Sequence, residues 1–146
     1  MTTLKDIKEA VVNILESLYP KMQIYGADTI EGYKRPSFFV SARLTTLEAT
    51  KNCIHQNAEI AIDYIQTSPD EEKGMGVLSN IQQNLTPKLV VGDRFLNTSD
   101  FDFDFVGTFA NIPHLEFQIE YWDEYGNKTE DEPQKMKKLI LRQEVR

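Results

Sequence analysis

Three aspartates alternate with three phenylalanines in the stretch SDFDFDFVG, Ser99–Gly107. The aspartates have the spacing of the first, third and fifth positions of an EF-hand calcium loop: Asp100, Asp102 and Asp104. That loop also needs glycine at its sixth position and a bidentate glutamate at its twelfth, where this sequence has Phe105 and Asn111. Strict alternation is instead typical of a strand with one apolar and one acidic face. We therefore expect a strand whose phenylalanines anchor a sheet to its helices, and no calcium site.

Other residues that could do chemistry are few. Cys53, His55 and His114 do not have the repeated ligand spacing of zinc sites. Cys53 and His55 would lie on one face of an extended strand, about 7 Å apart, which is too far for a nucleophile and its base. No serine lies in a nucleophile elbow, and Gly74–Gly76 lacks the lysine and hydroxyl residue of a phosphate loop. We expect no catalytic residue, cofactor or metal, and we expect both histidines to lie exposed on strands.

Composition limits the partners and the compartment. The 146 residues predict one domain, 1–146, with a net charge of -7 and a pI near 4.8. Such a chain is poorly suited to coating a nucleic-acid backbone, which requires lysine and arginine, although DNA could pass beside it without sticking. Cys53 is the single cysteine, so no intrachain disulfide can form. The first residues lack the features of a signal peptide, and no window reaches the length of a membrane span, so we expect a cytoplasmic protein.

Two helices are predicted to position the strands. Apolar residues recur at three- and four-residue steps over Leu4–Leu18, with Thr3 and Asp6 resembling a capping box and Pro20 ending the helix. A second helix is expected after SPDEE, with Asp70, Glu71 and Glu72 in its first turn, and it ends before Pro87 despite Gly74 and Gly76.

The remaining runs predict strands. A short strand at Met22–Tyr25 precedes a loop, Gly26–Pro36, and the runs SFFVSARLTTLEA and CIHQNAEIAIDYI are predicted to pair as a long hairpin around Thr50–Asn52. Further strands are expected at the following ranges: Leu89–Val91 and Arg94–Leu96 as a small hairpin, then Phe101–Val106 and Leu115–Trp122 joined by a connection that contains Pro113. The stretch DEYGNKTEDEPQ is expected to be a polar loop, and the tail KMKKLILRQEVR suits a helix or a strand, of which we favour the strand. The fold class is α+β, with a mainly antiparallel mixed sheet and two helices on one face.

Aromatic residues near the end of the last predicted strand favour an interaction surface. Tyr121, Trp122 and Tyr125 cluster there, and two of them must face away from the core if the strand alternates. Trp and Tyr are enriched at interface hot spots; the alternative is a core aromatic whose neighbour covers the sheet edge. The predicted strands within Phe38–Ile65 are long for a domain of this size, and such a hairpin could extend beyond the sheet to a neighbouring subunit.

The order of these elements resembles the tail terminator family of long-tailed phages and prophages, in the form found in Gram-positive hosts. The resemblance covers Leu4 to about Val145 and is carried by loose motifs: EGYKRPSFFVSARL, AIDYI, LVVGDRFLN and LEFQIEYWDEY. It implies a structural protein of the virion tail–neck region that is assembled in the host cytoplasm. It also implies a hexameric ring that caps the tail tube, ends tail growth and meets the head connector, while DNA passes through its centre. No catalysis, cofactor or membrane partner is implied.

Within this resemblance, two sets of residues become candidates. Acids that could line the channel are Asp102, Asp104, Glu116 and Glu120, because an acidic wall repels DNA and prevents it from stalling; the plain alternative is a solvated face. Residues that could contact a neighbouring subunit or partner are Tyr33, Arg35, Trp122 and Tyr125. The alternatives to a tail terminator are a neck or head-completion protein and, from another class, a small-molecule-binding or enzymatic domain that uses the carboxylates and His55.

Overall fold

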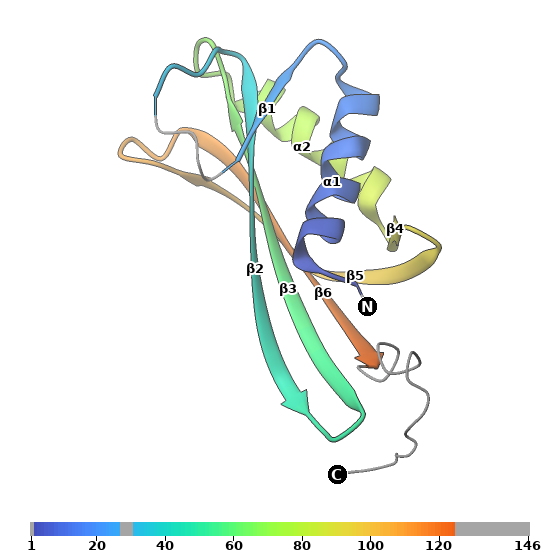
Figure 1. Ribbon diagram of the computed structural model, residues 1–146. Coiled ribbons are helices and arrows are strands. Elements are labelled where there is room, and N and C mark those ends of the chain that lie inside the picture. Colours follow the sequence, from blue (N-terminus) through green and yellow to red (C-terminus); the bar gives the residue numbers. More distant parts are fainter. Residues whose placement is uncertain (1, 27–30, 125–146) are drawn as a thin grey trace.

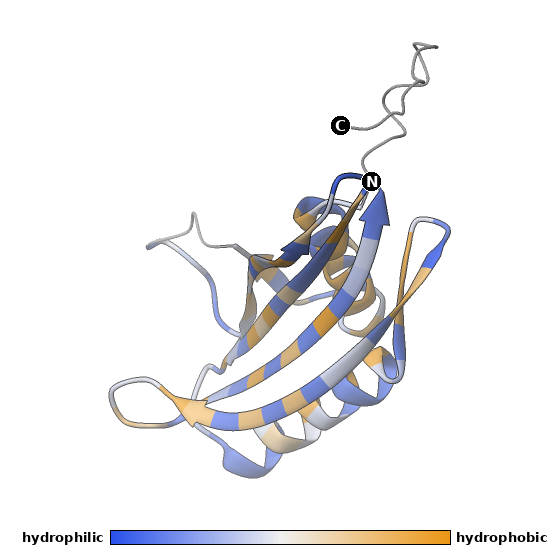
Figure 2. Ribbon diagram, turned by 90° about the horizontal axis from the view of Figure 1, so that it is seen from below, coloured by the Kyte–Doolittle hydropathy of each residue, from blue (hydrophilic) through white to orange (hydrophobic). Residues whose placement is uncertain are grey.

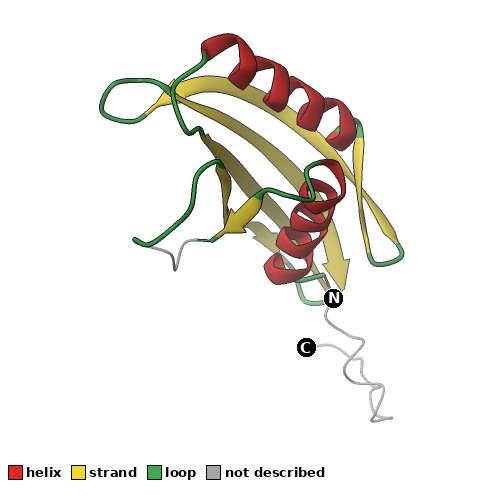
Figure 3. Ribbon diagram, turned by 90° about the horizontal axis from the view of Figure 1, so that it is seen from above, coloured by secondary structure: helices red, strands yellow, loops and turns green. Residues whose placement is uncertain are grey.

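Six strands form one curled sheet, and both helices pack against the same face of it (Figures 1 and 3). The computed structural model describes residues 2–26 and 31–124. The helices are α1 (Leu4–Leu18) and α2 (Glu71–Leu85), and the strands are β1 (Gln23–Tyr25), β2 (Ser37–Ala49), β3 (Cys53–Ile65), β4 (Lys88–Val91), β5 (Arg94–Val106) and β6 (Ile112–Glu124). The sheet order is β1-β2-β3-β6-β5-β4, in which β1 and β2 are parallel and every other neighbouring pair is antiparallel. The predicted α+β fold class is therefore confirmed.

Helix α1 has the predicted bounds because its signals are local. The Thr3 side chain accepts a hydrogen bond from the backbone N–H of Asp6, and the Asp6 carboxylate accepts one from the N–H of Thr3, which completes the capping box. Its apolar stripe is fully buried against the sheet at Ile7, Val11 and Leu15. The helix thus covers the sheet through side chains spaced one turn apart.

Helix α2 begins one residue later than the acidic run suggested. Asp70 lies outside the first turn and is the N-cap, and its carboxylate accepts a hydrogen bond from the N–H of Lys73 at 3.1 Å. Gly74 is buried where the helix crosses β6, and a Cβ atom there would lie 2.4 Å from Cγ of Pro113. Gly76 has open space around it. The glycine at position 74 therefore permits a close approach, whereas the glycine at position 76 does not.

The long hairpin of β2 and β3 has the predicted strands and turn. The Thr50 N–H donates a hydrogen bond to the Cys53 carbonyl at 2.8 Å, and the Cys53 N–H donates one to the Thr50 hydroxyl at 3.0 Å, which closes the turn. The tip of this hairpin extends beyond the helices, as Figure 1 shows, and Leu47 near the tip is 48% exposed. The hairpin therefore carries the sheet beyond the part that the helices cover.

Strands β5 and β6 are longer than predicted. The two separate strands expected at Arg94–Leu96 and Phe101–Val106 form one continuous strand, because a β-bulge between Ser99 and Asp102 lets the chain bend without ending. Asp100 in this bulge has a φ of 54°.

The placement of Pro113 in the connection between these strands was wrong. Pro113 belongs to β6, where it lies opposite Phe105, at the start of a strand, a position at which its missing N–H is tolerated. Asp123 and Glu124 likewise belong to β6 and not to the predicted polar loop. The rest of that loop and the predicted C-terminal strand lie outside the described residues.

Phe101, Phe103 and Phe105 of β5 lie on the helix side of the sheet, as the alternation predicts, whereas Phe95 of the same strand is 66% exposed. Phe101 and Phe103 pack against the buried core, and the ring of Phe101 stacks on Phe117 with centroids 5.0 Å apart. Phe105 is half-buried and contacts Phe103 edge to face. The striped colouring along the strands in Figure 2 shows the alternation of hydropathy that separates the two faces of the sheet.

Candidate assembly surface

The face of the sheet opposite the helices is covered by no other described element (Figures 1 and 2). Along β3, Ala58, Ile60 and Ile62 are fully buried on the helix side, and the residues between them point to the opposite side. We call this second surface the open face. Its charged and imidazole side chains come from four strands: Arg43, Glu48, His55, Glu59, Asp63, Asp102, Asp104, His114, Glu116, Glu120 and Glu124.

Strand register brings the four predicted acids onto this one face. Asp102 lies directly opposite Glu116 across the β5–β6 ladder, and Asp104 lies opposite His114. Glu120 lies farther along β6, opposite Asn57. Each of these acids is exposed or half-buried. Asp102 and Glu116 form an opposed pair of like charges, which costs about a few tenths to 1 kcal/mol in a sheet.

This face also carries further acids that the sequence did not connect with these four. Glu59 and Asp63 lie on the polar side of β3, and β3 pairs with β6, so that Ala61 faces Glu116 and Asp63 faces His114. Alternation in the sequence indicates the polar side of β3. It does not indicate that β6, some 50 residues later, is the neighbouring strand. The extended acidic surface therefore depends on a pairing that only the structure reveals.

His114 lies among the acids and partly offsets their charge. Its Nδ1 forms a hydrogen bond with the Asp63 carboxylate, and its Nε2 lies 3.6 Å from a Glu116 oxygen. Burial lowers the pKa of His114, but the hydrogen bond to Asp63 and the charges of Asp63 and Glu116 outweigh it, so the pKa is raised above 6.5. Arg43 forms an ion pair with Glu59 on the same face. Among the described residues, Asp102 and Asp104 have no cationic side chain as a partner.

Trp122 marks one end of the open face. Its indole is 49% exposed and stacks on the His55 ring, with centroids 4.4 Å apart and planes 7° from parallel. His55 Nε2 lies 3.8 Å from a Glu120 oxygen. The prediction of exposed histidines was wrong, because both His55 and His114 are half-buried against their cross-strand neighbours. Tyr121 faces the core and is buried, whereas the predicted contact residue Tyr125 lies outside the described residues.

Tyr33 and Arg35 lie near the opposite end of the face. The Tyr33 ring is half-buried and packs edge to face on Phe39, with centroids 5.1 Å apart. The exposed Arg35 guanidinium lies 5.5 Å from the centre of the Tyr33 ring and donates a hydrogen bond to the Gln66 carbonyl at 3.1 Å. These two predicted contact residues therefore already stabilise each other within the subunit, and the outer surface of Arg35 stays accessible.

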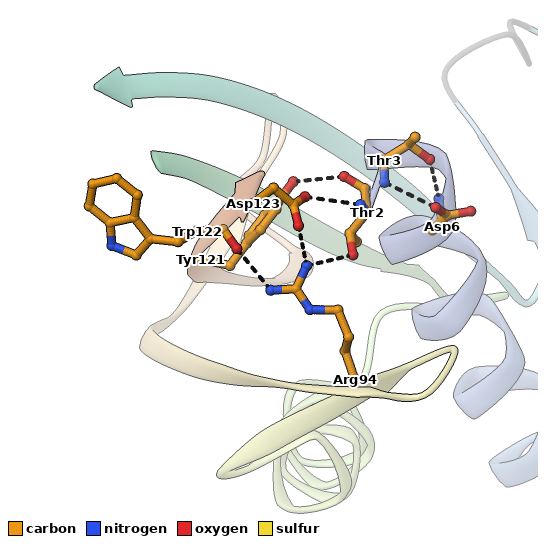
Figure 4. A network of polar contacts seen from close by, with 7 residues as sticks. All are labelled: Thr2, Thr3, Asp6, Arg94, Tyr121, Trp122 and Asp123. Atoms are coloured by element: carbon orange, nitrogen blue, oxygen red, sulfur yellow. Dashed lines mark hydrogen bonds and ion pairs between the residues drawn. The ribbon is translucent and has the colours of Figure 1, made fainter. Parts of the chain in front are cut away.

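A polar network holds the Trp122 end of the sheet to the start of the chain (Figure 4). Arg94 forms an ion pair with the buried Asp123, donates to the Thr2 hydroxyl at 2.9 Å and donates to the Trp122 carbonyl at 3.0 Å. Asp123 also accepts a hydrogen bond from the Thr2 N–H at 2.9 Å. Sequence reasoning missed this network, because its members lie 28 to 121 positions apart. The Trp122 side chain projects away from the network in Figure 4, so its indole is available for contacts.

The described residues offer little for catalysis or a metal. Within 2–26 and 31–124, no group of three or more His, Cys, Asp and Glu side chains is placed to hold a metal ion. No helix in this part of the chain is long and apolar enough to span a membrane.

Comparison with known proteins identifies the family. A protein-family model described as "Phage tail terminator protein" matches residues 6–135. The chain belongs to this family. Phage tail terminators are structural, non-enzymatic proteins, so the predicted absence of enzymatic activity is confirmed by the family. Membership also implies a location in the virion tail and interaction with the tail tube.

The other comparisons add less to this tail terminator. No curated protein matches it. One solved structure whose title names no function has 10% sequence identity and a TM-score of 0.47, over 86% of this chain and 97% of the other. That similarity carries no argument about function.

Proposed function

We propose that this tail terminator assembles into a hexameric ring that caps the tail tube, stops its growth and presents the surface that joins the head connector. The observation that carries the proposal is the family match over residues 6–135. A ring of identical subunits needs two different contact surfaces on each subunit, since a heterologous contact closes by rotation. The β2–β3 hairpin beyond the helices and the aromatic ends of the open face supply such surfaces.

The open face is proposed to line the channel through which DNA passes. Its acids would repel the phosphate backbone, and the wall would then lack the lysine and arginine contacts whose counterion release makes DNA bind. Asp102 and Asp104 are the best positions for testing this, because both are exposed and neither has a cationic partner among the described residues. Glu116 and Glu120 extend the same surface along β6.

Charge reversal on the open face tests the channel. Phage that carry Asp102→Lys and Asp104→Lys are expected to assemble particles with normal tails and to eject DNA poorly. A matched control reverses Glu9 and Glu16, which are exposed on α1 on the opposite side of the sheet. If the infectivity of this variant equals that of the control, the open face is an ordinary solvent-exposed surface. The proposal that it lines the channel is then wrong.

A tryptophan substitution tests the ring. Trp122→Ala removes an exposed aromatic of the type that dominates interface energetics, and truncation of such hot spots costs about 2 kcal/mol or more of binding free energy. We expect fewer rings on purified tail tubes by negative-stain imaging, and tails of uneven length. Phe109→Ala is the matched control, because Phe109 is 82% exposed in the β5–β6 connection. Intact rings and uniform tails in the Trp122 variant would show that this residue has no part in assembly.

A further inference from the structure

The open face has two hollows that are lined by acids and flank β6. One, of about 240 Å³, is lined by residues of β2, β3 and β6 that include Glu59, Glu116 and Arg43, which forms an ion pair with Glu59. The other, of about 340 Å³, is lined by residues of β3, β5 and β6 that include Glu59, Asp102 and Glu116, and none of these described lining residues is basic. Glu59 and Glu116 thus contribute to both hollows. The second hollow matches in charge the ammonium or guanidinium end of a long basic side chain, and the first already holds one such group.

The chain itself contains a segment of matching chemistry. Residues 135–146, KMKKLILRQEVR, include five basic residues and one acidic residue, a formal side-chain charge of +4. The whole chain has a net charge of -7, so the other 134 residues together have -11. The other residues of the segment are five apolar ones, Gln143 and Glu144, and the segment lies almost wholly beyond the part that the family model matches, residues 6–135.

The length of the chain allows this segment to reach the hollows. Strand β6 ends at Glu124, next to the Trp122 end of the open face. Lys135 follows eleven residues later, and eleven extended residues span at most about 36–40 Å. Glu116 lies eight residues back along β6, at about 26 Å for a strand rise of about 3.3 Å per residue. The basic segment can therefore lie along the face from which its own β6 departs.

We propose that residues 135–146 of the free subunit dock on the open face of the same subunit, with basic side chains in the second hollow, beside Glu116. The connection makes the contact intramolecular, and ten connecting residues, 125–134, give an effective concentration on the order of millimolar, above that of other subunits in dilute solution. The docked segment neutralises acids that have no other cationic partner, such as Asp102. This contact belongs to the free subunit, so it holds or fails independently of ring formation.

Paramagnetic relaxation enhancement in the full-length protein tests the contact. A nitroxide is attached to Thr45→Cys in a Cys53→Ser background, because Thr45 is exposed on the open-face side of β2 and lines neither hollow. Amide signals of residues 135–146 are expected to broaden in about 0.1 M salt and to recover in about 1 M salt, as the Debye length falls from about 10 to 3 Å. A label at Ser17→Cys, exposed on α1, is the control and should leave these signals sharp.

Variants of the acidic residues test whether the docking depends on charge, and mixing of differently labelled proteins tests whether it occurs within one subunit. Asp102→Asn with Asp104→Asn should reduce the broadening, whereas Glu9→Gln with Glu16→Gln on the helix side should not. Signals that stay sharp in low salt with the label at position 45 would overturn the proposal. Broadening that appears only when isotope-labelled protein is mixed with separate spin-labelled protein would also overturn it, because the segment would then occupy another copy.

Discussion

A single methyl group at position 74 should reveal how closely α2 approaches β6. In an exposed helix interior, replacing glycine by alanine stabilises by about 0.5–1 kcal/mol, since alanine loses less conformational entropy on folding. At Gly74 the new Cβ would lie 2.4 Å from Cγ of Pro113, so either the helix or β6 must shift. Overpacking of this kind costs about 1–3 kcal/mol. Gly74→Ala should therefore destabilise the protein by about 1–2 kcal/mol, even after the gain in helix propensity.

Gly76 gives the matched comparison within the same helix. A Cβ atom at Gly76 meets nothing within 4 Å, so Gly76→Ala should stabilise the protein by about 0.5–1 kcal/mol. Urea denaturation followed by circular dichroism measures both free energies of unfolding, and thermal midpoints should move in opposite directions by roughly 2–4 °C per kcal/mol. A Gly74→Ala protein at least as stable as the wild type would refute the close packing of α2 on Pro113.

Two polar contacts give further predictions. Arg94→Met should lower the free energy of unfolding by about 2–3 kcal/mol, because it leaves the Asp123 carboxylate buried without its cationic partner. This loss is smaller than the roughly 3–5 kcal/mol expected for a fully buried ion pair, since the Arg94 side chain is one-third exposed. Arg43→Met, which removes an exposed ion pair, is the control and should cost at most about 1 kcal/mol in the same urea titration. NMR titration should place the pKa of His114 above 6.5, and Asp63→Asn should lower it. Because folding raises the pKa of His114, its contribution to the free energy of unfolding is fully present below pH 6.5 and is lost as the pH rises through the folded pKa. A wild-type protein whose stability shows no such loss would contradict the contact between His114 and Asp63.

Elements governed by neighbouring residues could be predicted from the sequence. Helix α1 begins and ends where Thr3, Asp6 and the apolar spacing place it, because capping and helical periodicity act within a few residues. The β2–β3 hairpin was predictable for the same reason, since its strands adjoin a three-residue turn. The prediction of a strand for the alternating Phe and Asp residues was also correct. The bulge at Asp100 makes this segment part of a longer strand.

Features that depend on distant pairing could not be predicted. Nothing near β3 in the sequence indicates that β6 lies beside it, yet this pairing brings Asp63 to His114 and extends the acids across three strands. The anchor formed by Thr2, Arg94 and Asp123 joins three segments whose local patterns are unremarkable. Pro113 of β6 likewise lies close to Gly74 of α2, a residue from a distant part of the sequence. These contacts become visible only when the strand order is known.

The opposed acids of the open face are tolerated because β6 is held from its other side. Leu115, Phe117 and Ile119 are fully buried beneath the helices, and burying each such side chain stabilises by about 1.5–3 kcal/mol. The opposition of Asp102 and Glu116 costs at most about 1 kcal/mol. A sheet that obtains its stability from one face is free to accumulate like charge on the other. Packing both helices against the same side therefore leaves a large acidic surface available for assembly, at little expense to folding.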